Sequence, residues 1–173
     1  MPIKIENHSQ AKVPPKAEST LRSILSYLPK EHTRGLEKFR FVDFITDSRV
    51  RARTTSQLPA LYHPKQGSQL AWAEIAIGAI IPTSGSFFKK ILPRLTFKSN
   101  LAAIIISLVG QHYYLTLRHS VKKGQLENNI RMYTEKQLKG WHEQNNKFRT
   151  RIFKPLQPYL EKWARSLRQR TKK

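Results

Sequence analysis

The amino-acid sequence predicts an α+β fold in which a small sheet with a strand hairpin packs on a buried central helix, followed by C-terminal helices. Three observations predict it. Apolar residues alternate along residues 71–81, the period of a half-buried strand. Residues 99–117 carry no charge and, apart from Ser107, are apolar all round between 101 and 109, as in a helix buried on every side. Residues 126–143 return to a polar, helical pattern.

Two segments before the central helix are expected to form strands next to the run at 71–81. In residues 36–45, Phe39 and Phe41 alternate with Lys38 and Arg40, a pattern typical of a strand. Residues 58–64 precede a turn at Gly67, which predicts a hairpin with the strand that follows. Glu74 interrupts an otherwise neutral run, and an Arg or Lys is its expected partner.

The helices are expected at four places. A short capped helix begins near Ser19 and ends before Pro29, and residues 87–98 read as a basic connector. Asn100 is a candidate N-cap for the central helix, which ends before Gly124. Further helices are expected from Leu126 to about residue 143 and over residues 159–170.

These elements divide the chain into three parts. Residues 1–18 are expected to be a disordered basic tail, because they are polar and contain prolines, and they have no apolar stretch typical of a cleaved secretory signal. Residues 19–145 form the predicted domain. Residues 146–173 form a basic amphipathic helix that packs on it.

The charge of the chain predicts an attraction to polyanions. Its 32 Lys and Arg outnumber 11 Asp and Glu, which gives a formal charge of +21, and residues 122–173 alone carry +11. Nucleic acid is one such polyanion. The candidate polyanion-binding residues are the basic residues of the last twelve positions: Lys162, Arg165, Arg168, Arg170, Lys172 and Lys173. The chain has no cysteine, which excludes disulfides and thiol nucleophiles and is compatible with the cytoplasm, the expected location.

Residues 107–112, Ser-Leu-Val-Gly-Gln-His, resemble the metal-binding helix of zincin metalloproteases. Those enzymes carry His-Glu-x-x-His, with variants that read His-Glu-x-Gly-His-His, and a Glu on the next helix completes their zinc site. In the resemblance, Ser107 and Gln111 stand at the positions of the zinc-binding histidines and Leu108 at that of the general base. Only Gly110 and the additional His112 agree, and Glu127 is placed like the third ligand.

If the resemblance holds, the chain has lost the residues that hydrolysis requires. Zinc hydrolysis needs about three protein ligands and a base, and Leu108 cannot accept a proton. We therefore expect no metal, no cofactor and no enzymatic activity. The expected function is that of a pseudo-metalloprotease-like binding or structural module for a protein or polyanion partner.

A membrane-associated protein is the other alternative. Residues 69–88 carry one charge and residues 99–117 none, with basic residues between them, so the two runs would form a helical hairpin at 69–117. A span needs about 20 mostly apolar residues. Polar residues interrupt both runs, among them Glu74 in the first and Gln111 in the second.

Overall fold

A computed structural model describes residues 2–10, 13–46, 58–80, 87–117 and 123–153, and it confirms the α+β fold class. The chain divides into two compact units, Met1–Leu138 and Lys139–Lys173. The first unit contains the sheet and every element discussed below except the second half of the last helix. That half is the described part of the second unit, and the helix expected at 159–170 lies outside the described residues.

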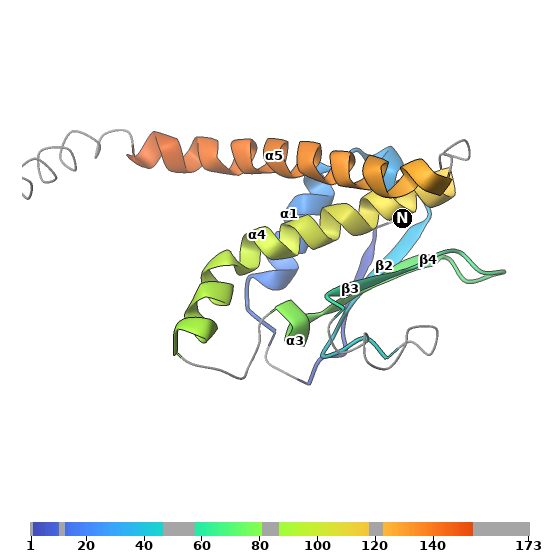
Figure 1. Ribbon diagram of the computed structural model, residues 1–173, viewed down its shortest axis with the longest axis horizontal. Helices are drawn as coiled ribbons and strands as arrows, with labels where there is room; N and C mark the ends of the chain where they lie inside the picture. The colour runs from blue at the N-terminus through green and yellow to red at the C-terminus, as the bar shows by residue number, and fades with distance from the viewer. Residues whose placement is uncertain (1, 11–12, 47–57, 81–86, 118–122, 154–173) are drawn as a thin grey trace, which may run out of the picture. The chain divides into compact units, whose positions relative to one another are not determined.

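The sheet has four strands in the order β1-β2-β4-β3 (Figure 1). They are β1 (Lys4–Asn7), β2 (Leu36–Val42), β3 (Ala60–His63) and β4 (Ala71–Ala76). Strands β1, β2 and β4 run parallel, and β3 pairs antiparallel with β4. The expected strand and hairpin are therefore confirmed, and Gly67 supplies the positive φ of +55° at the hairpin turn.

The N-terminal segment differs from the expected disordered tail, because Lys4–Asn7 form an edge strand. Its partner, β2, lies more than thirty residues away in the sequence. Glu6 fastens the strand to β2, since its two carboxylate oxygens pair with Lys38 Nζ and Arg40 Nε, both at 3.1 Å. A segment of four residues with two charges gives no hydrophobic period, so only the pairing with β2 reveals it as a strand.

The alternation along residues 71–81 is a strand only as far as Ala76. Residues Ile77–Ile80 form one helical turn, α3. At this turn the backbone passes close to Asp43, whose carbonyl oxygen accepts a hydrogen bond from Gly78 N at 3.2 Å. A Cβ at position 78 would lie 2.8 Å from that oxygen, so the close approach requires a glycine.

The helices are longer than expected. Helix α1 spans Ala17–Tyr27, α4 spans Phe87–His112, and α5 spans Leu126–Phe153, with short helical turns at Lys30–Thr33 (η1), Tyr113–Leu117 (η2) and Lys123–Gln125 (η3). The expected basic connector at 87–98 is wrong, because α4 already runs through it. Asn100 is not an N-cap: it lies inside α4, where its amide donates to Thr96 Oγ1 at 3.3 Å.

The core lies where α1 and α4 cover one face of the sheet (Figure 1). The inward positions of the strands and of α4 are fully buried, among them Phe39, Ile75, Leu101, Ile105 and Val109. Thr96–Leu117 is long and apolar enough to cross a membrane, and 44% of its most apolar 18-residue window is buried inside the structure. The helical hairpin expected at 69–117 in the membrane alternative is contradicted in its first half, because Ala71–Ala76 is a strand of the sheet.

Candidate functional site

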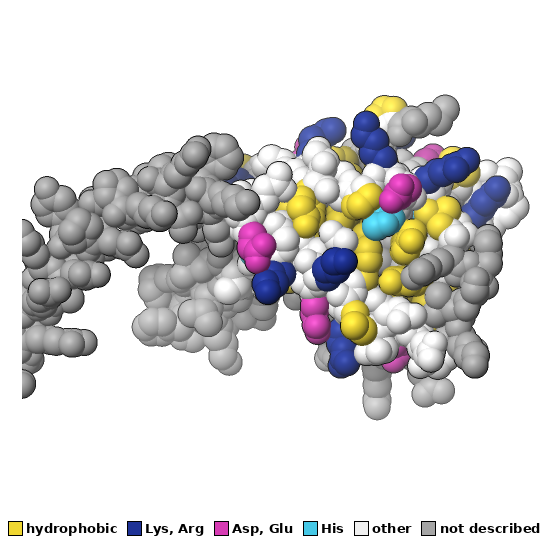
Figure 2. Space-filling model, turned by 90° about the horizontal axis from the view of Figure 1, so that it is seen from above, with side chains coloured by type: hydrophobic (Ala, Val, Ile, Leu, Met, Phe, Trp, Pro, Cys, Tyr) yellow, Lys and Arg dark blue, Asp and Glu magenta, His cyan; other side chains and the backbone are white. Residues whose placement is uncertain are grey.

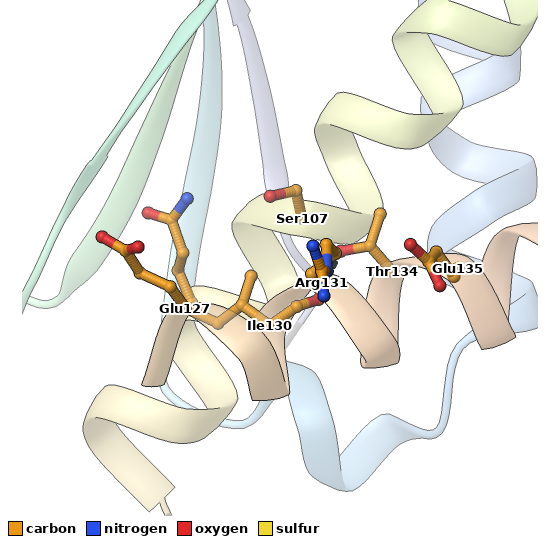
Figure 3. Close-up of a pocket in the computed structure, with 7 residues that line it drawn as sticks. Ser107, Glu127, Ile130, Arg131, Thr134 and Glu135 are labelled. Carbon is orange, nitrogen blue, oxygen red and sulfur yellow. Dashed lines mark hydrogen bonds between the residues drawn. The ribbon is translucent and has the colours of Figure 1, made fainter. Parts of the chain in front are cut away.

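A pocket of about 370 Å³ opens between α4 and the first turns of α5, within the first unit (Figure 3). Ser107 and Gln111 lie four residues apart on α4, hence on one side of that helix. Glu127 stands in the first turn of α5. The pocket is lined by residues of these two helices only: Ser107, Gln111, Glu127, Ile130, Arg131, Thr134 and Glu135. The structure thus brings together three of the six positions that the zincin resemblance names.

Some polar groups of this pocket form hydrogen bonds within their own helix, and others remain available to a ligand. Thr134 Oγ1 donates within its own helix to the Ile130 carbonyl at 2.7 Å, and Arg131 Nη2 donates to Asn128 Oδ1 at 3.1 Å. Within the described part of the chain, the side chains of Ser107, Gln111 and Glu127 make no hydrogen bond or ion pair. Hydrogen-bonding groups that converge in a concave site are the usual determinants of ligand orientation.

Leu108 and His112, two further positions of the resemblance, lie outside the pocket. Leu108 is 2% exposed and belongs to the core. His112 is fully buried, and its Nε2 lies 2.8 Å from the Arg34 carbonyl oxygen, to which it donates. Its Nδ1 therefore accepts from the Tyr62 hydroxyl at 2.8 Å. Burial lowers the pKa of His112, so this imidazole is neutral and joins α4 to β3 and to the turn before β2.

An aromatic cluster connects α5 to α4 beside the pocket. Tyr133 of α5 packs against Gly110 of α4, where a Cβ would lie 2.9 Å from the ring. The Tyr133 hydroxyl lies 2.9 Å from His32 Nδ1, and the ring of His32 contacts that of Tyr113 at 4.2 Å between centroids. Burial lowers the pKa of His32 and raises that of Tyr133. Tyr113 begins the π-helical turn η2, a type of turn that is frequent at functional sites.

The pocket does not have the composition of a metal site. Over the described ranges, no three His, Asp or Glu side chains are grouped closely enough to hold a metal ion. A hydroxyl, an amide and one carboxylate at positions 107, 111 and 127 are a poor donor set for zinc, which binds thiolate, imidazole and carboxylate.

A second cluster lies on the sheet face opposite α4, and the sequence analysis reached only part of it. Glu74 pairs with Arg40 Nη1 at 3.9 Å, as expected for an Arg or Lys partner, and also with His63 Nε2 at 3.3 Å. His63 stacks on Trp72 with 3.9 Å between centroids, and the Arg40 guanidinium lies 4.7 Å from the same ring. These groups satisfy one another across three strands, so we assign them to the stability of the sheet.

The six candidate polyanion-binding residues, Lys162, Arg165, Arg168, Arg170, Lys172 and Lys173, lie outside the described residues. The described face in Figure 2 shows cations and carboxylates interspersed with apolar patches. That mixture does not single out a polyanion site on this face.

Comparisons with known proteins identify no relative for this chain. No family model matches the sequence, and no curated protein or solved structure matches it either.

Proposed function

We propose that this protein is a non-catalytic, pseudo-metalloprotease-like binding module whose ligand site is the pocket between α4 and α5. One observation carries the proposal. The three positions that the resemblance gives to zinc ligands, 107, 111 and 127, line the same pocket although they come from two helices.

The chemistry of the pocket favours binding over hydrolysis. A hydrolytic zinc site needs a base that receives the proton of the attacking water. Leu108, at the position of that base, is buried and has no group that accepts a proton. Ser107 and Gln111 do not replace the imidazoles of a zinc site. What remains is a concave surface with uncommitted hydrogen-bonding groups.

Restoring the two histidines tests the proposal. Ser107→His combined with Gln111→His would join native Glu127 in a set of two imidazoles and one carboxylate, which is a zinc-binding set. We expect the restored chain to retain about one zinc ion per molecule by elemental analysis. Glu127→Ala in the restored chain should weaken zinc binding.

The matched control places two histidines at the same spacing elsewhere on α4, at the exposed positions 96 and 100. Thr96→His with Asn100→His should bind zinc more weakly, because positions 96 and 100 do not line the pocket that contains Glu127. Equal zinc retention by the two double variants would contradict the proposal. So would stoichiometric zinc or peptidase activity in the native protein.

The charge distribution favours a second function, polyanion binding by the C-terminal third. Residues 122–173 carry 15 basic and 4 acidic side chains. Changing Arg165, Arg168 and Arg170 to Gln should lower the slope of log affinity for heparin or DNA against log salt by about two to three units. An unchanged slope would assign the charge to solubility.

We propose a cytoplasmic location, with membrane association as the alternative. The apolar stretch Thr96–Leu117 contributes buried residues to the core, as the core helix of a soluble domain does, and this supports the cytoplasmic proposal. Fractionation tests this: the chain should remain in the supernatant without detergent, whereas an anchored chain would pellet with membranes.

A further inference from the structure

We propose that the pocket between α4 and α5 binds a small zwitterionic ligand of amino-acid size. This inference rests on the proposed function, because it takes the pocket to be a binding site. It adds the class of ligand, argued from the charges, dimensions and neutral groups of the pocket.

The pocket offers charges of both signs along one helix. Glu127, Arg131 and Glu135 follow one another at intervals of four residues on α5, so they lie on the same side of the helix (Figure 3). Side chains of opposite charge at this spacing commonly pair. Here, within the described residues, no ion pair within 4 Å joins them, and Arg131 Nη2 instead donates to Asn128. Both signs therefore remain available to a ligand.

The spacing of these charges fits a zwitterion. Residues four apart on a helix have their Cβ atoms about 5–6 Å apart. An α-amino acid carries its ammonium and carboxylate groups on a single carbon, so one molecule can meet a glutamate and Arg131 at the same time. The ammonium would donate to Glu127, and the carboxylate would accept from the remaining guanidinium N–H groups of Arg131.

The other walls and the size of the pocket agree with this class of ligand. Ser107 and Gln111 on α4 are neutral and can donate or accept, and Ile130 offers an apolar surface to a side chain. The volume of about 370 Å³ lies at the lower end of the range of small-molecule sites, about 300–1,000 Å³. That exceeds the needs of a bare ion and suits a small organic molecule.

Ligands of a single charge fit less well. A phosphate or other polyanion would meet the carboxylates of Glu127 and Glu135 on either side of Arg131. In the native pocket a metal ion would meet no imidazole, and the Arg131 guanidinium would oppose its charge. A zwitterion alone uses both kinds of group.

Calorimetric titration of the full chain with single L-amino acids at millimolar concentration tests the proposal. At least one should bind, and two analogues of it should bind about tenfold or more weakly: the amine without its carboxylate and the N-acetylated acid. Glu127→Gln and Arg131→Gln should each weaken binding by a similar factor. Lys136→Gln, an exposed change on the same helix outside the pocket, should leave the affinity unchanged.

The outcomes separate this inference from the proposed function. Absence of binding by every amino acid, or equal binding of the analogues, would overturn the zwitterion while leaving zinc binding by the restored chain as support for the module. A dipeptide that binds where no free amino acid does would also overturn it and would indicate a peptide terminus. If the restored chain fails to bind zinc but an amino acid binds through Glu127 and Arg131, the inferred ligand stands and the metalloprotease resemblance fails.

Discussion

The two sides of helix α4 differ in burial and in what constrains their side chains. The side towards the sheet consists of residues that are at most 2% exposed: Leu101, Ile105, Leu108, Val109 and His112. The side towards the pocket carries Ser107 and Gln111, which are partly exposed and have no partner within the described residues. On the first side, packing determines which residue types are tolerated. On the second, a ligand would be the main constraint, since the fold demands little there.

This difference offers a physical account of how a site can change while its fold persists. Replacing a residue of the core side creates a cavity, an overpacked contact or an unsatisfied polar group, each of which costs about 1–5 kcal/mol. Replacing a partly exposed residue that has no partner usually changes stability by no more than about 0.5 kcal/mol. Ser107 and Gln111 stand where such changes are tolerated, whereas His112 stands where they are not.

The largest expected effect is that of a charge on the core side. Ile105→Asp would place a carboxylate at a position with no exposed surface and no partner, which should cost several kcal/mol and unfold the domain. Ser107→Asp, two residues away on the pocket side, should change the free energy of unfolding by less than about 1 kcal/mol. Urea denaturation followed by circular dichroism measures both. Comparable losses would abolish the distinction between the two sides.

A smaller loss is expected from His112→Ala, which leaves the Arg34 carbonyl without its donor and creates a cavity. The free energy of unfolding should fall by about 2–4 kcal/mol at neutral pH. Tyr62→Phe is the milder comparison, because it removes one hydroxyl that His112 and Thr116 share. It should cost about 1 kcal/mol. A loss below about 1 kcal/mol for His112→Ala would show that the buried network contributes little.

The same imidazole makes stability depend on pH. Burial lowers the pKa of His112 in the folded state, so the unfolded chain takes up this proton at a higher pH than the folded chain. Its contribution to stability is complete above the unfolded pKa of about 6.5 and is lost as the pH falls from there towards the folded value. The difference between wild type and His112→Ala should therefore shrink between neutral pH and about pH 5. A constant difference would contradict the assignment.

The sequence predicts the fold where one pattern dominates. Alternation along β2 and β4 and the turn at Gly67 are local signals, and the structure confirms them. Strand β1 has no such signal, because it depends on pairing with residues more than thirty positions away. The early start of α4 was missed for a related reason, since charged residues at 87–98 suggested a connector but do not end a helix.

The candidate site was predictable only in part. The resemblance selected Ser107, Gln111 and Glu127, which the structure places in one pocket. Arg131 and Glu135 were missed, although their four-residue spacing from Glu127 on an expected helix was a signal that they share its side. The sequence cannot show that Arg131 donates to Asn128 and leaves both glutamates unpaired, because that depends on side-chain conformation.

A moderate effect is expected where the two helices meet at Gly110. Gly110→Ala would bring a Cβ within 2.9 Å of the Tyr133 ring. The clash should cost about 1–3 kcal/mol, offset by about 1 kcal/mol from the higher helix propensity of alanine. Gly124→Ala is the matched control, because no atom lies within 4 Å of the added methyl group. Thermal unfolding should show a lower Tm for Gly110→Ala only, and equal Tm values would argue against the close packing of Tyr133 on α4.

The smallest effect on stability is expected from removing the polar side chains on the pocket side of α4. Ser107→Ala combined with Gln111→Ala removes both neutral polar groups without breaking a hydrogen bond within the described residues. Alanine has the highest helix propensity, so the free energy of unfolding should stay within about 0.5 kcal/mol of wild type or rise slightly. Ligand affinity should fall, since the wall opposite Glu127 and Arg131 then offers no hydrogen bond. A loss of more than about 1 kcal/mol of stability would mean that the two side chains hold α4 and α5 together. The pocket would then be part of the packing of the fold, and the case for a ligand there would lose its physical basis.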